Sequence, residues 1–109
     1  MSEWVRVGGK KDFSTEGAFA VKVGGKDVCL IQLGGIFYAM DDRCTHAESM
    51  LSAGEVEDGE IACALHGARF DVKTGDALTP PAVKPVRTHE VKIEGDNVMV
   101  RLSDVPSAV

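Results

Sequence analysis

The sequence predicts an all-β protein made of antiparallel sheets. Short runs rich in β-branched and aromatic residues alternate along the chain with turn signals such as Gly24-Gly25, Gly34-Gly35 and Asp58-Gly59. No window of about a dozen residues carries apolar side chains at helical spacing. With 109 residues, the chain has the size of one ordinary domain. We therefore expect a single domain over residues 1–109.

The first half of the chain is predicted to contain four strands, at residues 4–7, 18–23, 27–33 and 36–40. Gly24-Gly25 and Gly34-Gly35 separate the last three, because glycine pairs adopt the tight turns that join antiparallel strands. Cys29 lies inside the strand "DVCLIQL", so we expect it to be a buried core thiol.

The second half is predicted to contain five strands, at residues 56–57, 60–63, 68–71, 86–93 and 98–102. Asp58-Gly59 suits the positive φ values of a two-residue hairpin turn, and "VKIEGDNVMVRL" predicts a second hairpin. In that hairpin Val98, Val100 and Leu102 occupy alternate positions, which gives the strand one apolar face. His89, in "RTHEVKI", is expected at the surface of its strand.

The charge and the apolar runs exclude two classes of partner. A formal net charge of −5 with dispersed Lys and Arg argues against a nucleic-acid-binding surface. The N-terminus has no apolar run after a basic start, and the longest apolar stretches are far too short to span a membrane. We therefore expect a soluble, cytoplasmic protein that binds neither nucleic acid nor membranes.

Two short Cys-His pairs stand out in a chain with only three cysteines and three histidines. The pairs are Cys44-Thr45-His46 and Cys63-Ala64-Leu65-His66. Three cysteines cannot all pair within the chain, and a reducing compartment keeps thiols free unless a metal binds them. Each pair follows a predicted strand, and its short spacing brings both side chains to a metal with little loop-closure entropy. The sequence therefore predicts Cys44, His46, Cys63 and His66 as metal ligands on two loops.

Two kinds of metal centre use such a ligand set. Structural zinc takes two cysteines and two histidines, but usually groups like residues together, with the histidines on a helix. A two-iron, two-sulfide cluster with two histidines on one iron takes one thiolate and one imidazole from each loop. The mixed pairs favour the iron–sulfur cluster, and a zinc-stabilised binding module remains the alternative.

The segment "CTHAESMLSAGEVEDGEIACALHGARFDVKTG" resembles the cluster-binding segment of the Rieske iron–sulfur proteins. The flanking strands, "PPAVKPV" and the terminal hairpin resemble the rest of that small domain. The resemblance implies a Rieske iron–sulfur domain, with a cluster-binding part at about residues 41–81 inserted in a β-sandwich base. It also implies one [2Fe-2S] cluster per chain, with Cys44 and Cys63 on one iron and His46 and His66 on the other. Pro80-Pro81 resembles the loop that covers such clusters.

The chain departs from the respiratory branch of that family at four positions. Ser49 and Leu65 stand where those proteins carry a disulfide beside the cluster. Ala68 and Phe70 replace a serine and a tyrosine whose hydroxyls donate hydrogen bonds toward the cluster sulfurs. Because such donors stabilise the reduced cluster, we expect a reduction potential at the low end of the range for these centres.

A low-potential, single-domain protein of this kind resembles the ferredoxin component of bacterial aromatic-ring-hydroxylating dioxygenase systems. The resemblance implies a monomeric carrier of single electrons, which pass from an NADH-dependent flavin reductase to a terminal oxygenase. It is not an enzyme itself: beyond the two predicted ligands only His89 remains, too few histidines for the mononuclear iron of an oxygenase. The alternative is a Rieske-like small subunit of an assimilatory nitrite reductase.

Three acidic residues flank the first Cys-His pair: Asp41, Asp42 and Glu48. We expect them to form a solvated acidic face, rather than a docking site for a basic partner.

Overall fold

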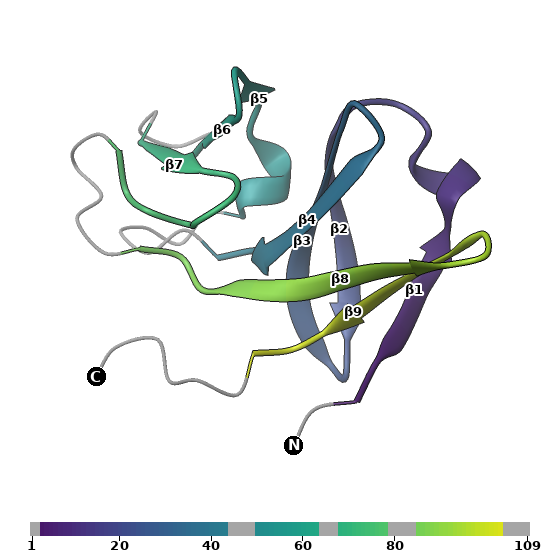
Figure 1. Cartoon of the computed structure of the whole chain (residues 1–109). Coiled ribbons are helices and arrows are strands. Elements are labelled where there is room, and N and C mark those ends of the chain that lie inside the picture. Colours follow the sequence, from purple (N-terminus) through teal and green to yellow (C-terminus); the bar gives the residue numbers. More distant parts are fainter. Residues whose placement is uncertain (1–2, 44–49, 64–67, 79–84, 104–109) are drawn as a thin grey trace.

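The computed structural model describes residues 3–43, 50–63, 68–78 and 85–103, which form antiparallel sheets with very little helix (Figure 1). The strands of these ranges are β1 Val5–Gly9, β2 Gly17–Val23, β3 Lys26–Leu33, β4 Ile36–Asp41, β5 Val56–Glu57, β6 Glu60–Ala62, β7 Arg69–Asp71, β8 Thr88–Glu94 and β9 Asn97–Arg101. Two single-turn 3-10 helices, η1 Lys10–Phe13 and η2 Leu51–Ala53, were not predicted. Neither helix is long or apolar enough to span a membrane, and no other helix occurs in the described ranges. The all-β prediction is confirmed.

Every predicted strand is present, with ends that differ by a few residues. β8 begins at Thr88 rather than at residue 86, because the Val86 N–H donates to the carbonyl of Gly75 instead of continuing the pairing with β4. The turn between β5 and β6 has the predicted geometry, since φ is +54° at Asp58 and +76° at Gly59.

The nine strands divide into two sheets. One sheet has six strands in the order β1-β9-β8-β4-β3-β2, and we call it the base. The other has three strands in the order β5-β6-β7, and we call it the small sheet. The base bends between β4 and β8, which pair only at Ala39 with His89 and at Met40 with Thr88. The small sheet and η2 lie beside the base, at the end away from η1 (Figure 1).

β3 is buried on both faces and joins the two cores of the molecule. Val28 and Leu30 belong to the core of the base, together with side chains from β2, β4 and β9. Cys29 and Ile31 point the other way, into the core shared with the small sheet. All four side chains are fully buried. Cys29 is therefore a core thiol, as predicted, and β3 fixes the small sheet against the base.

Truncating either face of β3 should destabilise the protein strongly. We expect Leu30→Ala and Ile31→Ala each to lower the free energy of unfolding by about 2–5 kcal/mol, because each opens a cavity in a closed core. Denaturant unfolding would measure the loss. The control is Ile36→Ala: Ile36 is 58% exposed on β4, so its truncation should change the free energy by no more than about 0.5 kcal/mol. Equal effects of Ile31→Ala and Ile36→Ala would contradict the two-core arrangement.

Candidate metal centre

Of the four predicted ligands, Cys63 lies within the described residues. It follows β6 directly, and its side chain is buried. Its backbone N–H donates to the carbonyl of Ala68 over 2.6 Å, so the residues that flank 64–67 are bonded to each other. Cys44, His46 and His66 lie outside the described residues, and their role as ligands stays a prediction.

The residues that flank 44–49 are also joined. Arg43 and Met50 form an isolated antiparallel bridge, and the carbonyl of Asp42 accepts the N–H of Leu51. The Asp42 carboxylate accepts two more hydrogen bonds, from the Ser52 N–H to Oδ1 at 2.6 Å and from the Ser52 hydroxyl to Oδ2 at 2.8 Å. Asp42 is only 1% exposed, so its predicted place on a solvated acidic face is wrong. Glu48 lies outside the described residues.

The described residues on either side of 79–84, the segment that contains Pro80-Pro81, lie beside the small sheet. The Leu78 N–H donates to the carbonyl of Arg69 in β7, and the Val86 N–H donates to the carbonyl of Gly75. Gly75 permits this close approach, because a Cβ there would lie 2.1 Å from the Val86 carbonyl oxygen and φ is +79°. The described residues that flank all three segments therefore lie at the small sheet or at its junction with the base. Pro80-Pro81 itself lies outside the described residues.

His89 is buried, so its predicted place at the surface is wrong. Its ring is fully covered, with Nε2 2.7 Å from Asp41 Oδ1 and Nδ1 3.0 Å from the backbone N–H of Ser103. Because Nδ1 accepts the Ser103 N–H, Nε2 carries the proton and donates it to Asp41. The signal in the sequence was the alternation of His89 with Val91 and Ile93, which places His89 on the partly apolar face of β8.

The hydrogen bond from His89 also affects the acidity of Asp41. Burial by itself raises the pKa of Asp41, but the His89 hydrogen bond and the ammonium group of Lys26 outweigh it. The pKa of Asp41 is therefore below its ordinary value, and the carboxylate stays ionised at neutral pH. By contrast, burial and the nearby Asp42 carboxylate both raise the pKa of Cys29 far above that of a free thiol. Cys29 is therefore a neutral core residue and not a thiolate ligand.

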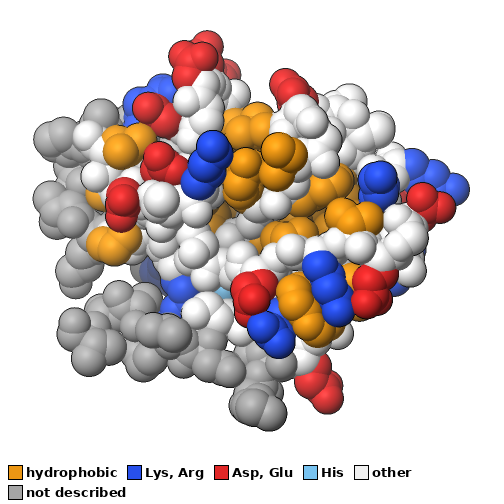
Figure 2. Space-filling model, viewed as in Figure 1, with side chains coloured by type: hydrophobic (Ala, Val, Ile, Leu, Met, Phe, Trp, Pro, Cys, Tyr) orange, Lys and Arg blue, Asp and Glu red, His pale blue; other side chains and the backbone are white. Residues whose placement is uncertain are grey.

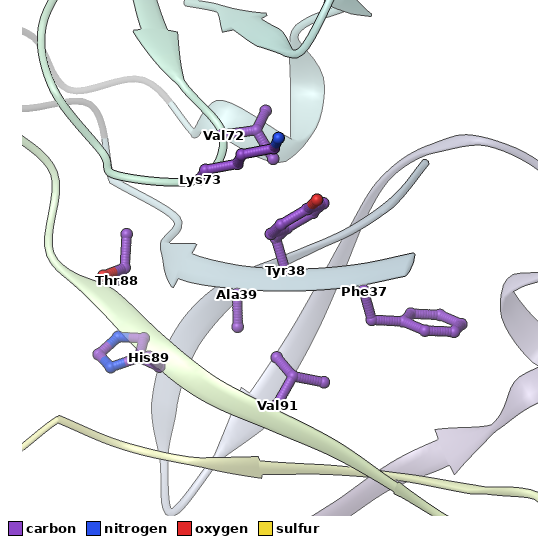
Figure 3. Close-up of a pocket in the computed structure, with 8 residues that line it drawn as sticks. All are labelled: Phe37, Tyr38, Ala39, Val72, Lys73, Thr88, His89 and Val91. Carbon is purple, nitrogen blue, oxygen red and sulfur yellow. The ribbon is translucent and has the colours of Figure 1, made fainter. Parts of the chain in front are cut away.

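A small open pocket of about 110 Å³ lies between β4, β8 and the turn after β7 (Figure 3). Tyr38 extends from β4 toward the turn that carries Val72 and Lys73, whereas the His89 ring points away from that turn. This volume is smaller than the roughly 300–1,000 Å³ of typical small-molecule sites. Both ring nitrogens of His89 are engaged in hydrogen bonds, so the pocket offers no free imidazole for catalysis.

The donor set fits an iron–sulfur cluster with mixed ligands. Two thiols and two imidazoles match the [2Fe-2S] centres in which histidines replace cysteines on one iron. Cys63 is buried beside the bonded flanks, which suits a thiolate shielded from water. Ala68, which is bonded to Cys63, and Phe70, which pairs with Ile61 of β6, are both fully buried, and neither contributes a hydroxyl.

Comparisons with known proteins agree with this centre. The chain is 40% identical over 99 residues to the ferredoxin component of the naphthalene 1,2-dioxygenase/salicylate 5-hydroxylase systems of Ralstonia sp., a match that covers 91% of this chain and 95% of that protein. Its structure is similar to the ferredoxin of carbazole 1,9a-dioxygenase from Nocardioides aromaticivorans, with a TM-score of 0.87, 36% identity and coverage of 91% of this chain and 97% of the other.

Two further solved structures bear on the choice between functions. The chain resembles a chain in the complex of reduced oxygenase and oxidised ferredoxin of carbazole 1,9a-dioxygenase, with a TM-score of 0.83, 32% identity and coverage of 89% and 91%. It also shares the fold of a putative nitrite reductase small subunit, with a TM-score of 0.79, 22% identity and coverage of 90% and 97%. The model of the Rieske [2Fe-2S] domain family matches residues 3–107. The chain therefore belongs to the Rieske [2Fe-2S] domain family.

Proposed function

We propose that this protein is an electron carrier: the ferredoxin component of a multicomponent aromatic-ring dioxygenase system. The observation that carries the proposal is the 40% identity, over nearly the whole length of both chains, to a curated ferredoxin component of such a system. The chain has no reaction of its own. Its bound [2Fe-2S] cluster supplies a one-electron couple.

The proposed ligands are Cys44 and Cys63 on one iron and His46 and His66 on the other. The burial of Cys63 and the bonded flanks of 44–49 and 64–67 support this assignment. The proposed cluster-binding part covers about residues 41–81, and the base supports it through β3 and β4. Oxidation of a substrate would take place on the partner oxygenase.

The proposed partners are a terminal oxygenase, which accepts the electron, and a flavin-dependent reductase, which takes it from NADH. The oxygenase is supported by the similarity to the solved complex of the carbazole system. We further propose that the carrier is monomeric and cytoplasmic. An acidic protein with a net charge of −5 would meet partners with basic docking surfaces most readily.

The nitrite reductase alternative has weaker support. At 22% identity, the likeness to the putative small subunit concerns the fold alone. The identities of 32–40% belong to the dioxygenase ferredoxins and to the carbazole complex.

The first test follows the electron. With NADH and a flavin-dependent ferredoxin reductase under anaerobic conditions, we expect the visible absorbance of the oxidised cluster to bleach. Addition of the oxidised oxygenase of carbazole 1,9a-dioxygenase should restore it, because that oxygenase forms a complex with a structurally similar ferredoxin. Stopped-flow absorbance measures both steps. Reduction no faster than with NADH alone, or no reoxidation by the oxygenase, would contradict the proposed role.

The second test concerns the ligands and uses the core cysteine as a matched control. Cys63→Ala should abolish cluster binding, and the double replacement of His46 and His66 by alanine should do the same, because each removes ligands from an iron. Cys29→Ala should keep the cluster, since Cys29 is equally buried and packs in the same core but lies within β3, outside both Cys-His pairs. Iron and acid-labile sulfide per chain are the readouts. Retention of the visible spectrum by the double histidine variant would contradict the assignment.

The third test concerns the reduction potential. Because Ala68 and Phe70 provide no hydroxyl, we expect a midpoint of about −100 mV or lower, near the bottom of the range for such centres. Ala68→Ser should raise it, by at most about 60–130 mV if the new hydroxyl bonds to a cluster sulfur. Ala39→Ser, at a buried alanine in the core of the base, should leave the midpoint unchanged. A wild-type midpoint above about +100 mV would contradict this account.

A further inference from the structure

Asp42 is a buried carboxylate between the base and the small sheet. It follows β4, lies two residues before Cys44 and is only 1% exposed. A carboxylate is costly to bury unless hydrogen bonds compensate for the lost water. Here both carboxylate oxygens are used, and both bonds go to the same residue, Ser52.

Asp42 provides hydrogen-bond acceptors for the first turn of η2. The residue before η2, Met50, provides no side-chain cap, so the first N–H groups of the helix need acceptors from elsewhere. Asp42 supplies them across the segment 44–49: its carbonyl accepts the Leu51 N–H and its Oδ1 accepts the Ser52 N–H. Leu51 itself is fully buried in the core of the small sheet. The end of β4 and the start of η2 are thereby fixed to each other.

The other end of η2 packs against the residue that precedes Cys63. A Cβ on Gly54 would lie 1.8 Å from the carbonyl oxygen of Ala62, so only glycine allows this contact. The Ala62 N–H also donates to the carbonyl of Glu55 over 2.9 Å. A continuous series of short contacts thus runs from Asp42 through η2 to Ala62, and Cys63 is the next residue.

We propose that Asp42 is a positioning residue for the cluster: its two bonds to Ser52 set the flank of the first Cys-His pair relative to Cys63. This inference rests on the proposed function, because it assumes that both pairs bind one cluster. Residues that do not bind a metal themselves commonly fix the positions of its ligands through contacts of this kind.

Three variants test whether the hydrogen bonds of Asp42, rather than its negative charge, stabilise the bound cluster. Asp42→Ala removes both bonds, and Ser52→Ala removes only the bond to the hydroxyl. Asp42→Asn keeps an oxygen for the Ser52 N–H and offers an N–H to the hydroxyl, so it preserves the contacts without the charge. The matched control is Asp12→Ala, which removes from η1 the carboxylate that accepts the N–H of Gly9, at the opposite end of the base (Figure 1).

The experiment measures loss of the cluster from the holoprotein in the presence of a chelator, together with the electron paramagnetic resonance spectrum after reduction. We expect Asp42→Ala to lose the cluster about tenfold faster, which corresponds to about 1.4 kcal/mol, and to show altered g values. Ser52→Ala should have an intermediate rate. Asp42→Asn should restore most of the wild-type rate and spectrum, and Asp12→Ala should match the wild type.

Unfolding of the base, followed by the fluorescence of Trp4, separates positioning from general stability. Trp4 lies on the base, with its ring 4.4 Å from Lys92 Nζ. In Asp42→Ala, we expect the free energy of unfolding reported by Trp4 to fall by less than the about 1.4 kcal/mol that corresponds to the faster loss of the cluster. If Asp42→Ala loses the cluster at the wild-type rate and keeps the wild-type spectrum, the proposal is overturned. It is also overturned if the free energy of unfolding reported by Trp4 falls as much as the faster loss of the cluster implies. If Asp42→Ala does not fold, Ser52→Ala decides: a wild-type rate and spectrum would overturn the proposal. A wild-type protein without acid-labile sulfide would instead refute the proposed function.

Discussion

The double burial of β3 is the constraint on which the rest of the structure depends. A strand with apolar side chains on both faces has to be covered twice, and here the base covers one face and the small sheet the other. Because Cys29 and Ile31 share one core with Ile61, Cys63 and Phe70, the position of the small sheet follows from the packing of β3. The flanks of the predicted ligand segments take their places from that packing.

Short polar contacts further fix the positions of the segments that pack around β3. Asp42 ties the end of β4 to η2, His89 ties β8 to Asp41, and Gly75 lets the turn after β7 approach Val86 closely. The contacts of Asp42 and Gly75 lie where the base meets the small sheet, and the contact of His89 joins two strands of the base. The opposite end of the base has a different character, with the aromatic cluster of Phe13, Phe19 and Phe37.

One face of the molecule carries hydrophobic side chains surrounded by charged ones (Figure 2). β4 and β8 pair at only two positions, and each carries an exposed isoleucine beyond them, Ile36 in β4 and Ile93 in β8. Figure 2 shows hydrophobic side chains in the middle of this face, with Lys, Arg, Asp and Glu side chains around them. This patch belongs to the base, whereas Cys63 lies in the core shared with the small sheet.

The sequence predicted the strands well because their signals are local. Glycine pairs, the Asp58-Gly59 turn and the alternation in β9 each act within a few residues. The burial of Asp42 and His89 was missed because it depends on contacts between distant segments. Asp42 bonds to Ser52 ten residues away, and His89 bonds to Asp41 across 48 positions. The Cys-His pairs were identified from their residue types and spacing, because ligand chemistry limits which residues occur in such pairs, and their role as ligands stays a prediction.

The most direct test of the central claim is electron paramagnetic resonance of the dithionite-reduced protein, combined with assays of iron, zinc and acid-labile sulfide. We predict two irons and two sulfides per chain. The average g value should be lower than that of a cluster held by four thiolates. Stoichiometric zinc without sulfide would contradict the account, and so would a spectrum typical of four-thiolate ligation.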